Sequence, residues 1–358
     1  MPTNRACPLL QCGVQVVAVN PMHCVHLVDV IPNPSENKLP QGLPEERLRE
    51  AVARSGYPLQ SVVASELQKT FAVTEEWGFP DRTTHEHRTL DIFAFKKLPE
   101  ENRGGLLVAP SVALLIECKQ SALPYVFFRS VVTEWGSRTR DFPTITGLQR
   151  LELHAGDRTR ETTPSECLGL SAEPFVAAGP PVCASLAAAA GGGTRKEDKG
   201  GANKGEDEDA AHHGKNIRLT GSEAYNSTLL PLISATEHLR DYYRSATGPL
   251  HPTVAFAVCV LDAPMVLSDG GPQEFALLMV PWVRVVRQEK IKHSQGYMHR
   301  QHVIDFVHRF ALPSFVVEVL GFASVARERL IDKGAVFQRG HGTVADLDGW
   351  TWTEVQPR

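Results

Sequence analysis

Hydrophobic and polar positions predict two helices and then three strands in the first third of the chain. Residues 43–56 start with acidic residues, place apolar side chains four residues apart and end at a glycine, as an amphipathic helix does. Residues 59–69 predict a second helix. Strand-like segments follow at 71–77, 90–95 and 112–119, separated by turns rich in proline and glycine. The third segment is almost entirely apolar, which indicates a central strand buried on both faces.

The regular pattern is interrupted in the middle of the chain. Residues 187–215 are of low complexity, mix glycine with both signs of charge and contain almost nothing to bury, so they predict disorder. They lie inside a wider segment, residues 136–216, which we interpret as an insertion rather than a second domain. Order resumes at Thr220, where helical periodicity extends to about residue 243 with a kink expected at Pro231.

The last third of the chain predicts more strands followed by helices. Residues 254–261 and 275–286 are strand-like. Residues 301–330 have a helical pattern that is broken near Pro313. The two helices and three strands of the first third therefore precede another helix and two further strands.

These elements combine into an α/β fold, with a mixed central sheet of about five strands flanked by helices. Residues 1–44 form an N-terminal region of strands, at the β-branched runs 14–19 and 25–31, and a loop. Residues 45–286 form the core, which contains the insertion. Residues 287–358 form a helical C-terminal extension.

Composition is that of an ordinary soluble globular protein, with 42% hydrophobic and 22% charged residues. The seven cysteines are too widely spaced for a disulfide framework, which predicts reduced thiols and a cytoplasmic location. The apolar stretch 313–326 contains Glu318 and is too short to span a bilayer, so no membrane is expected. A formal net charge of −4 gives no overall basic signature, and nucleic-acid binding would require a local positive surface.

The third predicted strand ends in charged residues. Side chains alternate between the faces of a strand, so Glu117 and Lys119 point the same way, roughly 6.6 Å apart along the strand. Cys118 points the opposite way and is predicted to be a buried thiol rather than a nucleophile. Asp91 opens the preceding apolar strand and approaches Glu117 if the two strands are antiparallel neighbours. The sequence therefore predicts two carboxylates and an amine at one rim of a sheet.

Two carboxylates and one amine suit the metal-assisted hydrolysis of a phosphodiester. Hard oxygen ligands select Mg²⁺ or Mn²⁺, so Asp91 and Glu117 are the predicted metal ligands. Lys119 would orient the attacking water or stabilise the pentavalent transition state. Gln120 follows immediately and is a weaker candidate for a polar helper.

Asp91, followed by Glu117 and Lys119 in a Glu-x-Lys triplet, resembles the restriction-endonuclease-like PD-(D/E)xK nuclease superfamily. The resemblance includes the helix before these residues and the helix and strands after them, and it covers roughly residues 45–135 and 220–286. It implies that the two acids bind metal and that the lysine assists the nucleophile. It also implies a nucleic-acid substrate, with DNA favoured over RNA because the superfamily mostly acts on DNA.

The resemblance leaves several points open. The family tends to carry an acidic residue on the helix before the sheet, for which Glu66 is the first candidate and Glu46 the second. Leu90 stands where the motif has proline, a departure that the family often tolerates. A homodimer is kept open as the assembly. The rival interpretation is a catalytically inactive module that keeps the fold and binds nucleic acid or a protein partner.

A basic stretch near the C-terminal end offers a second candidate surface. Residues 284–309 are rich in arginine, lysine and histidine, with two aromatic residues in and beside the stretch, and could follow a phosphate backbone. A solvated helix and loop explains the same pattern equally well. The candidate nucleic-acid-binding residues are Arg284, Arg287, Lys290 and Lys292.

Overall fold

The computed structural model falls into two compact units, residues 1–51 and 52–358. Helix α1 (Glu45–Arg54) starts in the first unit, buries no residue and carries an ion pair between Arg49 and Glu45. The strands expected at 14–19 and 25–31, and most of the low-complexity segment, lie outside the described residues. The structure describes residues 33–82, 84–129, 142–191, 217–242, 248–271, 273–293, 296–350 and 354–356.

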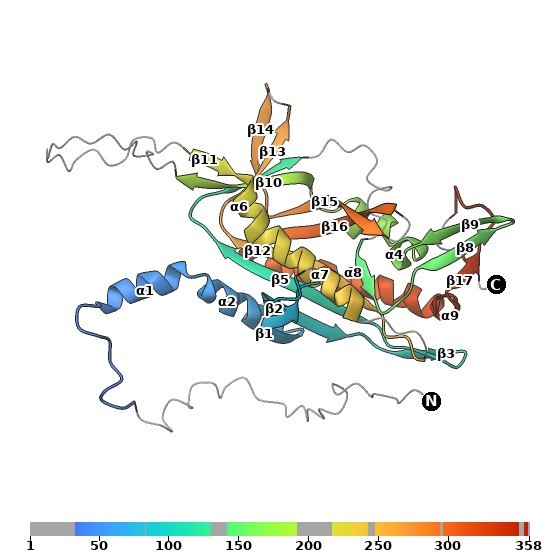
Figure 1. Ribbon diagram of the computed structural model, residues 1–358, viewed down its shortest axis with the longest axis horizontal. Coiled ribbons are helices and arrows are strands. Elements are labelled where there is room, and N and C mark those ends of the chain that lie inside the picture. The colour runs from blue at the N-terminus through green and yellow to red at the C-terminus, as the bar shows by residue number, and fades with distance from the viewer. Residues whose placement is uncertain are drawn as a thin grey trace. The chain divides into compact units, whose positions relative to one another are not determined.

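The second unit is built on a mixed sheet to which the described residues contribute twelve strands (Figure 1). Neighbouring strands follow the order β1-β2-β5-β12-β16-β15-β10-β6-β13-β14, while β7 pairs with β12 and β11 with β10. The expected α/β class is confirmed, but the expected number of about five strands is wrong. The strands are β1 (Ala72–Pro80), β2 (His87–Lys97), β5 (Ser111–Gln120), β6 (Tyr125–Arg129), β7 (Thr144–Thr146), β10 (Val182–Gly191), β11 (Ile217–Thr220), β12 (Thr253–Asp262), β13 (Met265–Gly270), β14 (Phe275–Met279), β15 (Trp282–His293) and β16 (Gly296–His308).

Part of the larger sheet comes from the segment expected to be an insertion. Its described residues contribute β7 and β10 to the main sheet, and β8 and β9 to a three-stranded sheet with β17. Strand β10 is rich in alanine and takes its place through pairing with β6, β11 and β15. The smaller elements are β3 (Glu101–Arg103), β4 (Leu106–Val108), β8 (Leu151–Ala155), β9 (Arg158–Thr162), β17 (His341–Thr343), α4 (Pro164–Cys167), η3 (Leu170–Ala172) and α5 (Pro174–Ala177).

Four strands at one side of the sheet carry the predicted chemistry. Strands β1, β2 and β5 form an antiparallel meander, and β12 lies parallel to β5. The β5–β12 ladder is unbroken from Ser111↔Thr253 to Gln120↔Asp262. Every residue of β5 before Lys119 is buried, which confirms the expected central strand. The end of this strand therefore presents its charged residues at the edge of a rigid scaffold.

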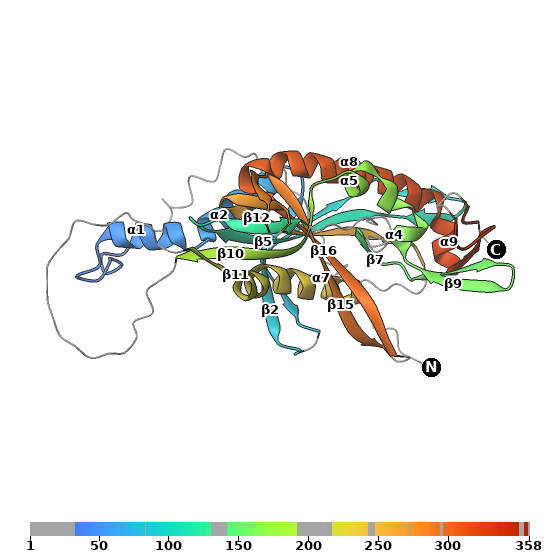
Figure 2. The ribbon, with the colours of Figure 1, turned by 90° about the horizontal axis from the view of Figure 1, so that it is seen from above.

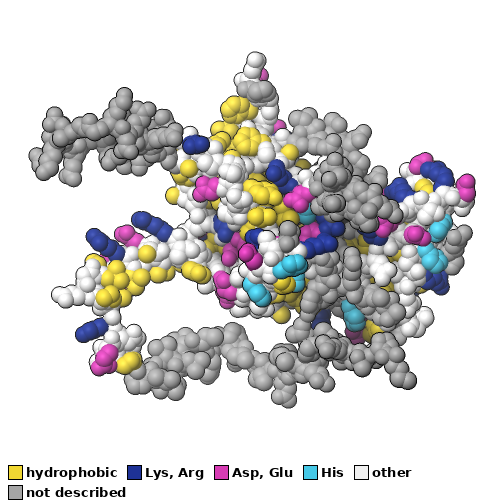
Figure 3. Space-filling model, viewed as in Figure 1, with side chains coloured by type: hydrophobic (Ala, Val, Ile, Leu, Met, Phe, Trp, Pro, Cys, Tyr) yellow, Lys and Arg dark blue, Asp and Glu magenta, His cyan; other side chains and the backbone are white. Residues whose placement is uncertain are grey.

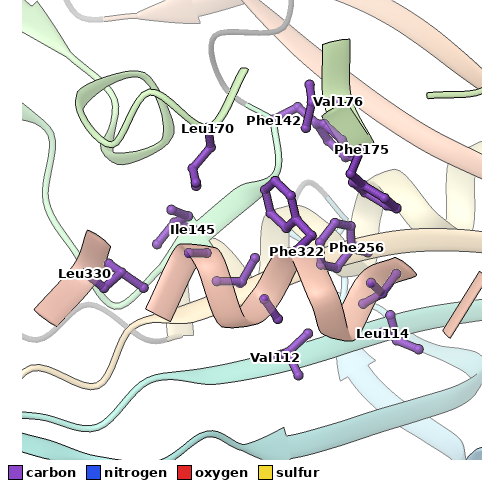
Figure 4. Close-up of a cluster of buried hydrophobic side chains, with 14 of the residues drawn as sticks. Val112, Leu114, Phe142, Ile145, Leu170, Phe175, Val176, Phe256, Phe322 and Leu330 are labelled. Atoms are coloured by element: carbon purple, nitrogen blue, oxygen red, sulfur yellow. The ribbon is translucent and has the colours of Figure 1, made fainter. Parts of the chain in front are cut away.

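Helices cover both faces of the sheet (Figure 2). Helices α2 (Tyr57–Gln68) and α8 (Leu312–Asp332) pack on one face, where Phe175, Phe256 and Phe322 form an aromatic cluster (Figure 4). On the other face, α6 (Gly221–Ala224), the π-helical turn η4 (Tyr225–Leu229) and α7 (Leu230–Tyr242) cover a second hydrophobic cluster. Alternate residues of β5 enter the two clusters, as strand geometry requires.

The C-terminal region departs from the expected helical extension. Residues 301–308 belong to β16, which pairs with β15 in a long antiparallel hairpin, so the helix expected at 301–330 begins only after the short helix η5 (Arg309–Ala311). Strand pairing with β12 and β15 overrides the local helical pattern. Helix α9 (Gly334–Arg339) follows α8.

Helix α8 is long and apolar enough to cross a membrane by length and composition alone. Its buried residues recur three or four positions apart, from Leu312 and Phe315 to Leu330 and Ile331. This spacing places one stripe of the helix against the sheet. The same stripe is the pattern of a core helix.

Candidate active site at the β2–β5 strand ends

Asp91 and Glu117 lie at the point where strands β2 and β5 separate. The ladder between them ends at Ile92↔Ile116, and its register makes Asp91 and Glu117 the next opposite positions. The backbone N–H of Cys118 donates to Oδ2 of Asp91 at 2.7 Å, and a backbone hydrogen bond from Asp91 reaches the Glu117 carboxylate. Beyond the last pair of the ladder, backbone N–H groups thus donate to the two carboxylates instead of to backbone carbonyls of the opposite strand. These hydrogen bonds hold both carboxylates in position.

Lys119 completes the predicted group. Its Nζ lies 2.8 Å from Oε2 of Glu117, with side-chain exposures of 29% for the lysine and 4% for the glutamate. The two residues are two positions apart in β5, so they share a face of the strand as expected. The amine of Lys119 is therefore more accessible to solvent than the carboxylate of Glu117.

Burial dominates the electrostatics of this group. Burial raises the pKa of Glu117 to about 7; the amine of Lys119 opposes this shift, and the charge of Asp91 adds to it. Burial likewise raises the pKa of Asp91, although the N–H of Cys118 and the amine of Lys119 oppose the shift. Burial lowers the pKa of Lys119, but the neighbouring Glu117 outweighs it and leaves that pKa above its usual value. Burial therefore disfavours the ionised forms of both acids, and a bound cation would favour them.

Two further polar residues adjoin the group and were not found from the sequence. Glu76 of β1 faces Asp91 between the pairs Glu75↔Ile92 and Trp77↔Leu90, and its φ of 50° is left-handed. The Nε2 of Gln60 donates to Oε1 of Glu76 and to the backbone oxygen of Asp91, both at 3.0 Å. Gln60 is a polar residue on the buried face of α2, which is the signal that could have identified it.

None of the hydrogen bonds and ion pairs described above involves the weaker sequence candidates. Glu66 forms an ion pair with Lys69, and six residues of helix place it roughly 240° around α2 from Gln60. Glu46 is exposed on α1. Gln120 is exposed at the end of β5, where it pairs with Asp262 of β12. At the site, α2 contributes the amide of Gln60 rather than the expected acidic residue.

The residues present suit a hard divalent cation. Among the described residues, no three His, Cys, Asp or Glu side chains gather as a metal-binding group. Mg²⁺ is often held by only one or two protein carboxylates, with water and substrate phosphates supplying the other ligands. The carboxylates of Asp91 and Glu117, both with pKa values raised by burial, fit that limited role.

Cys118 lies on the other face of β5, as the strand alternation predicts. It belongs to the hydrophobic cluster beneath α2 and α8, and burial raises the pKa of its thiol far above the usual range. A thiol that stays protonated is a poor nucleophile. The prediction of a buried core cysteine is confirmed.

The residues of the basic stretch differ in their exposure to solvent. Arg284 is fully buried: its Nε lies 2.8 Å from Oδ1 of Asp305, and its Nη1 donates to the backbone oxygen of Phe175. The prediction that Arg284 contacts nucleic acid is therefore wrong. Arg287 is partly exposed, with its guanidinium over the ring of Tyr225. The side chains of Lys290 and Lys292 lie outside the described part of the chain.

A cavity of about 390 Å³ lies near the other end of β12, where β7 pairs with Thr253–Ala255. Glu117 pairs with Cys259, which is four residues further along β12, or roughly 13 Å. None of the three predicted catalytic residues lines the cavity, so it is separate from the candidate site. Its charged lining residues are Arg150, Glu161, Arg240 and Arg300.

Comparison with known proteins found no similar family, protein or structure. No family model matches the chain, and neither a curated protein nor a solved structure matches it.

Proposed function

We propose that this protein is a metal-dependent nuclease that hydrolyses phosphodiester bonds, with DNA favoured over RNA. The observation that carries the proposal is the convergence of three residue types at one strand end. Asp91 and Glu117 occupy opposite positions where β2 and β5 separate, and Lys119 contacts Glu117. Two acids and a lysine so arranged are the features on which the resemblance to the PD-(D/E)xK superfamily rests.

The order of the surrounding elements supports the same proposal. Helix α2 precedes the meander β1, β2 and β5, and α7 then leads into β12, which is parallel to β5. A helix, three strands, a helix and a further strand is the order that the resemblance implies. The other strands of the sheet extend this core without separating its members.

Each residue of the site has a chemical role in the proposed reaction. A divalent cation bound by Asp91 and Glu117 would polarise the phosphoryl group and lower the pKa of an attacking water. Lys119, held by Glu117, would donate to the attacking water or to a non-bridging oxygen on which charge develops. Gln60 would hold Glu76 and the backbone of Asp91, and so fix the carboxylate of Asp91.

A catalytically inactive module that binds nucleic acid or a protein is the second candidate. It is favoured by the closed ion pair between Glu117 and Lys119 and by the amide of Gln60 where the family has an acid. In that case the pair would stabilise the strand ends rather than act on a substrate. The two candidates make opposite predictions for cleavage and the same prediction for folding.

Nicking of supercoiled plasmid DNA tests the proposal. The full chain should nick DNA in Mg²⁺ or Mn²⁺ and lose this activity in EDTA, while Glu117→Ala and Lys119→Ala should each lower the rate at least about 100-fold. A parallel assay with single-stranded RNA decides between the two nucleic acids. Circular dichroism of each variant shows whether it is folded.

Matched controls come from the C-terminal end of β2 and the loop that follows it. Lys97 is exposed as the last residue of β2, and Glu100 is exposed in the loop, so Lys97→Ala and Glu100→Ala should cut like the unaltered chain. Cleavage that persists in both Glu117→Ala and Lys119→Ala would rule out this site. Metal-independent binding of DNA without cleavage would favour the inactive module.

A further inference from the structure

The hairpin of β13 and β14 projects from one edge of the main sheet (Figure 1). Among the described strands, β14 is hydrogen-bonded to β13 alone, so within the described part of the chain no strand pairs with its other side. Such an edge is a template for pairing with another strand. Proteins commonly protect edges with charged residues, proline or a bulge, and the sequence of β14, FALLM, contains none of these.

The exposed side chains of β14 are large and apolar. The exposed fractions are 56% for Phe275, 61% for Leu277, 46% for Leu278 and 70% for Met279. Hydrophobic side chains gather on this hairpin in Figure 3. Five consecutive exposed residues without a charge exceed the scattered apolar residues of an ordinary surface.

The apolar surface continues onto the neighbouring strands. The register of β6, β13 and β14 aligns Phe128 with Ser268 and Leu277, and Val126 with Val266 and Met279. Residues opposite one another in neighbouring strands share a face of the sheet. Phe128 is 36% exposed, so one face of the hairpin and its open edge form a single patch.

The far edge of the sheet is protected, in contrast to β14. Strand β1 carries the adjacent acids Glu75 and Glu76, both exposed, and the left-handed φ of Glu76 interrupts its pairing geometry. An apolar strand such as β14 does not complement this acidic edge. Pairing of β14 with β1 of another copy, which would build an open-ended array, is therefore disfavoured. Pairing of β14 with β14 of a second copy is favoured instead.

We propose that β14 is the interface of a homodimer in which two copies pair antiparallel about a two-fold axis at Leu277. This register places Phe275 opposite Met279 and Ala276 opposite Leu278, so every position meets an apolar partner. The contact is self-complementary and closes after two copies. The uncharged strand lacks the cationic groups that a nucleic-acid partner requires. The inference is independent of the proposed nuclease activity.

The small area of the patch limits the expected affinity of the dimer. One edge strand and part of one sheet face lie at the low end of specific interfaces. We therefore expect a reversible dimer with a dissociation constant on the order of micromolar. Sedimentation velocity of the full chain from about 1 to 100 μM should show the shift from monomer to dimer.

The variant Leu277→Lys tests the proposed axis. It places two like charges opposite each other in the dimer, and the dimer should dissociate at least about 10-fold more readily. Val317→Lys is the matched control, because Val317 is 67% exposed on α8 and lies away from the hairpin. Circular dichroism confirms that both variants fold. A chain that stays monomeric at every concentration, or a dimer unaffected by Leu277→Lys, overturns the proposal.

Cross-linking tests the register directly. The thiols of Leu277→Cys would meet across the axis, since opposite Cα atoms in an antiparallel pair lie roughly 4.5–5.5 Å apart. Under mild oxidation this variant should yield a covalent dimer, and Val317→Cys and the unaltered chain should not. Equal cross-linking of Val317→Cys, or recovery of higher oligomers instead of a dimer, would contradict the proposed two-fold contact.

Discussion

The Glu117 carboxylate is buried beside the amine of Lys119 and the carboxylate of Asp91, at the point where β2 and β5 separate. Because burial raises its pKa to about 7, the protonation of this residue changes within the physiological pH range. A carboxyl whose pKa is higher in the folded protein than in the unfolded chain binds its proton more tightly when folded. The free energy of unfolding therefore falls as the pH rises from about 4.5 to about 7.

Substituting the carboxyl by an amide removes this dependence. The difference between the two pKa values, 4.5 and about 7, corresponds to roughly 3 kcal/mol. In metal-free buffer, Glu117→Gln should therefore unfold at a higher temperature than the unaltered chain at pH 8 and at a similar temperature at pH 4. Thermal unfolding at several pH values in EDTA measures this. A constant difference across the range would show that Glu117 ionises normally.

The backbone of Glu76 supports a second prediction. A left-handed conformation costs a non-glycine residue roughly 1–2 kcal/mol, and glycine is free of this cost. Glu76→Gly should relieve the strain, although it removes one acceptor of Gln60. Glu75→Gly, made at a neighbouring residue of ordinary φ, should instead destabilise the strand by roughly 0.5–1 kcal/mol.

Urea unfolding of the two variants compares these effects. We expect Glu76→Gly to be more stable than Glu75→Gly by about 1–2 kcal/mol. Equal stabilities would mean that the left-handed conformation of Glu76 stores no strain. If Glu76→Gly also lowers the proposed nuclease activity, the strained conformation of Glu76 contributes to the arrangement of the site.

Residues of the site differ in how far the sequence reveals them. Asp91, Glu117 and Lys119 are recognisable because strand periodicity fixes their faces and the apolar strands fix their neighbours. Glu76 is not, because the left-handed residue breaks the alternation of β1. The role of Gln60 is not evident either, because its partners lie 16 and 31 residues away in the chain; its polar side chain on the buried face of α2 is the one local signal.

At the scale of elements, β15 and β16 show how a local pattern misleads. The charged residues of this hairpin suggested a solvated surface, yet Arg284 and Asp305 face each other across the ladder in the interior. Trp282, which is partly buried, also donates to Asp305, so one carboxylate accepts hydrogen bonds from two side chains. Pairing between distant strands fixes this arrangement, and the sequence of either strand alone does not contain it.

The buried pair makes a prediction about stability. Asp305→Ala leaves the guanidinium of Arg284 buried without its carboxylate, which should cost about 3–5 kcal/mol. The double variant Arg284→Met with Asp305→Ala should lose less than the sum of the losses of Arg284→Met and Asp305→Ala, because no charge is left unpaired. Chemical unfolding of the single and double variants measures the coupling.

An exposed ion pair provides the control for this cycle. Arg103 and Asp332 are 2.9 Å apart with both side chains about half exposed. Asp332→Ala should change the unfolding midpoint far less than Asp305→Ala, since exposed pairs contribute little. Additive losses at Arg284 and Asp305 would show that their charges are not coupled in the folded protein.

At the scale of the whole second unit, the class of fold was predictable and the extent of the sheet was not. Helical and strand periodicities are local, so α2, β1, β2, β5 and β12 appear in the sequence close to their observed bounds. The sequence does not predict strand β10, because alanine has little preference for strands. Only pairing with neighbouring strands places these residues in the sheet. Tertiary pairing thus enlarged a sheet of about five expected strands to twelve.

The two hydrophobic clusters share this sheet, which predicts that they unfold together. Leu330 of α8 and Leu232 of α7 are both buried, on opposite faces, and alternate residues of β5 belong to each cluster. Losing either cluster would expose one face of the buried strands. Leu330→Ala and Leu232→Ala should each cost about 2–5 kcal/mol and shift a single transition, followed by both circular dichroism and calorimetry. Two transitions, each moved by only one variant, would instead mean that the faces fold as separate units. One common transition would make the sheet the element that connects the proposed site to the rest of the core.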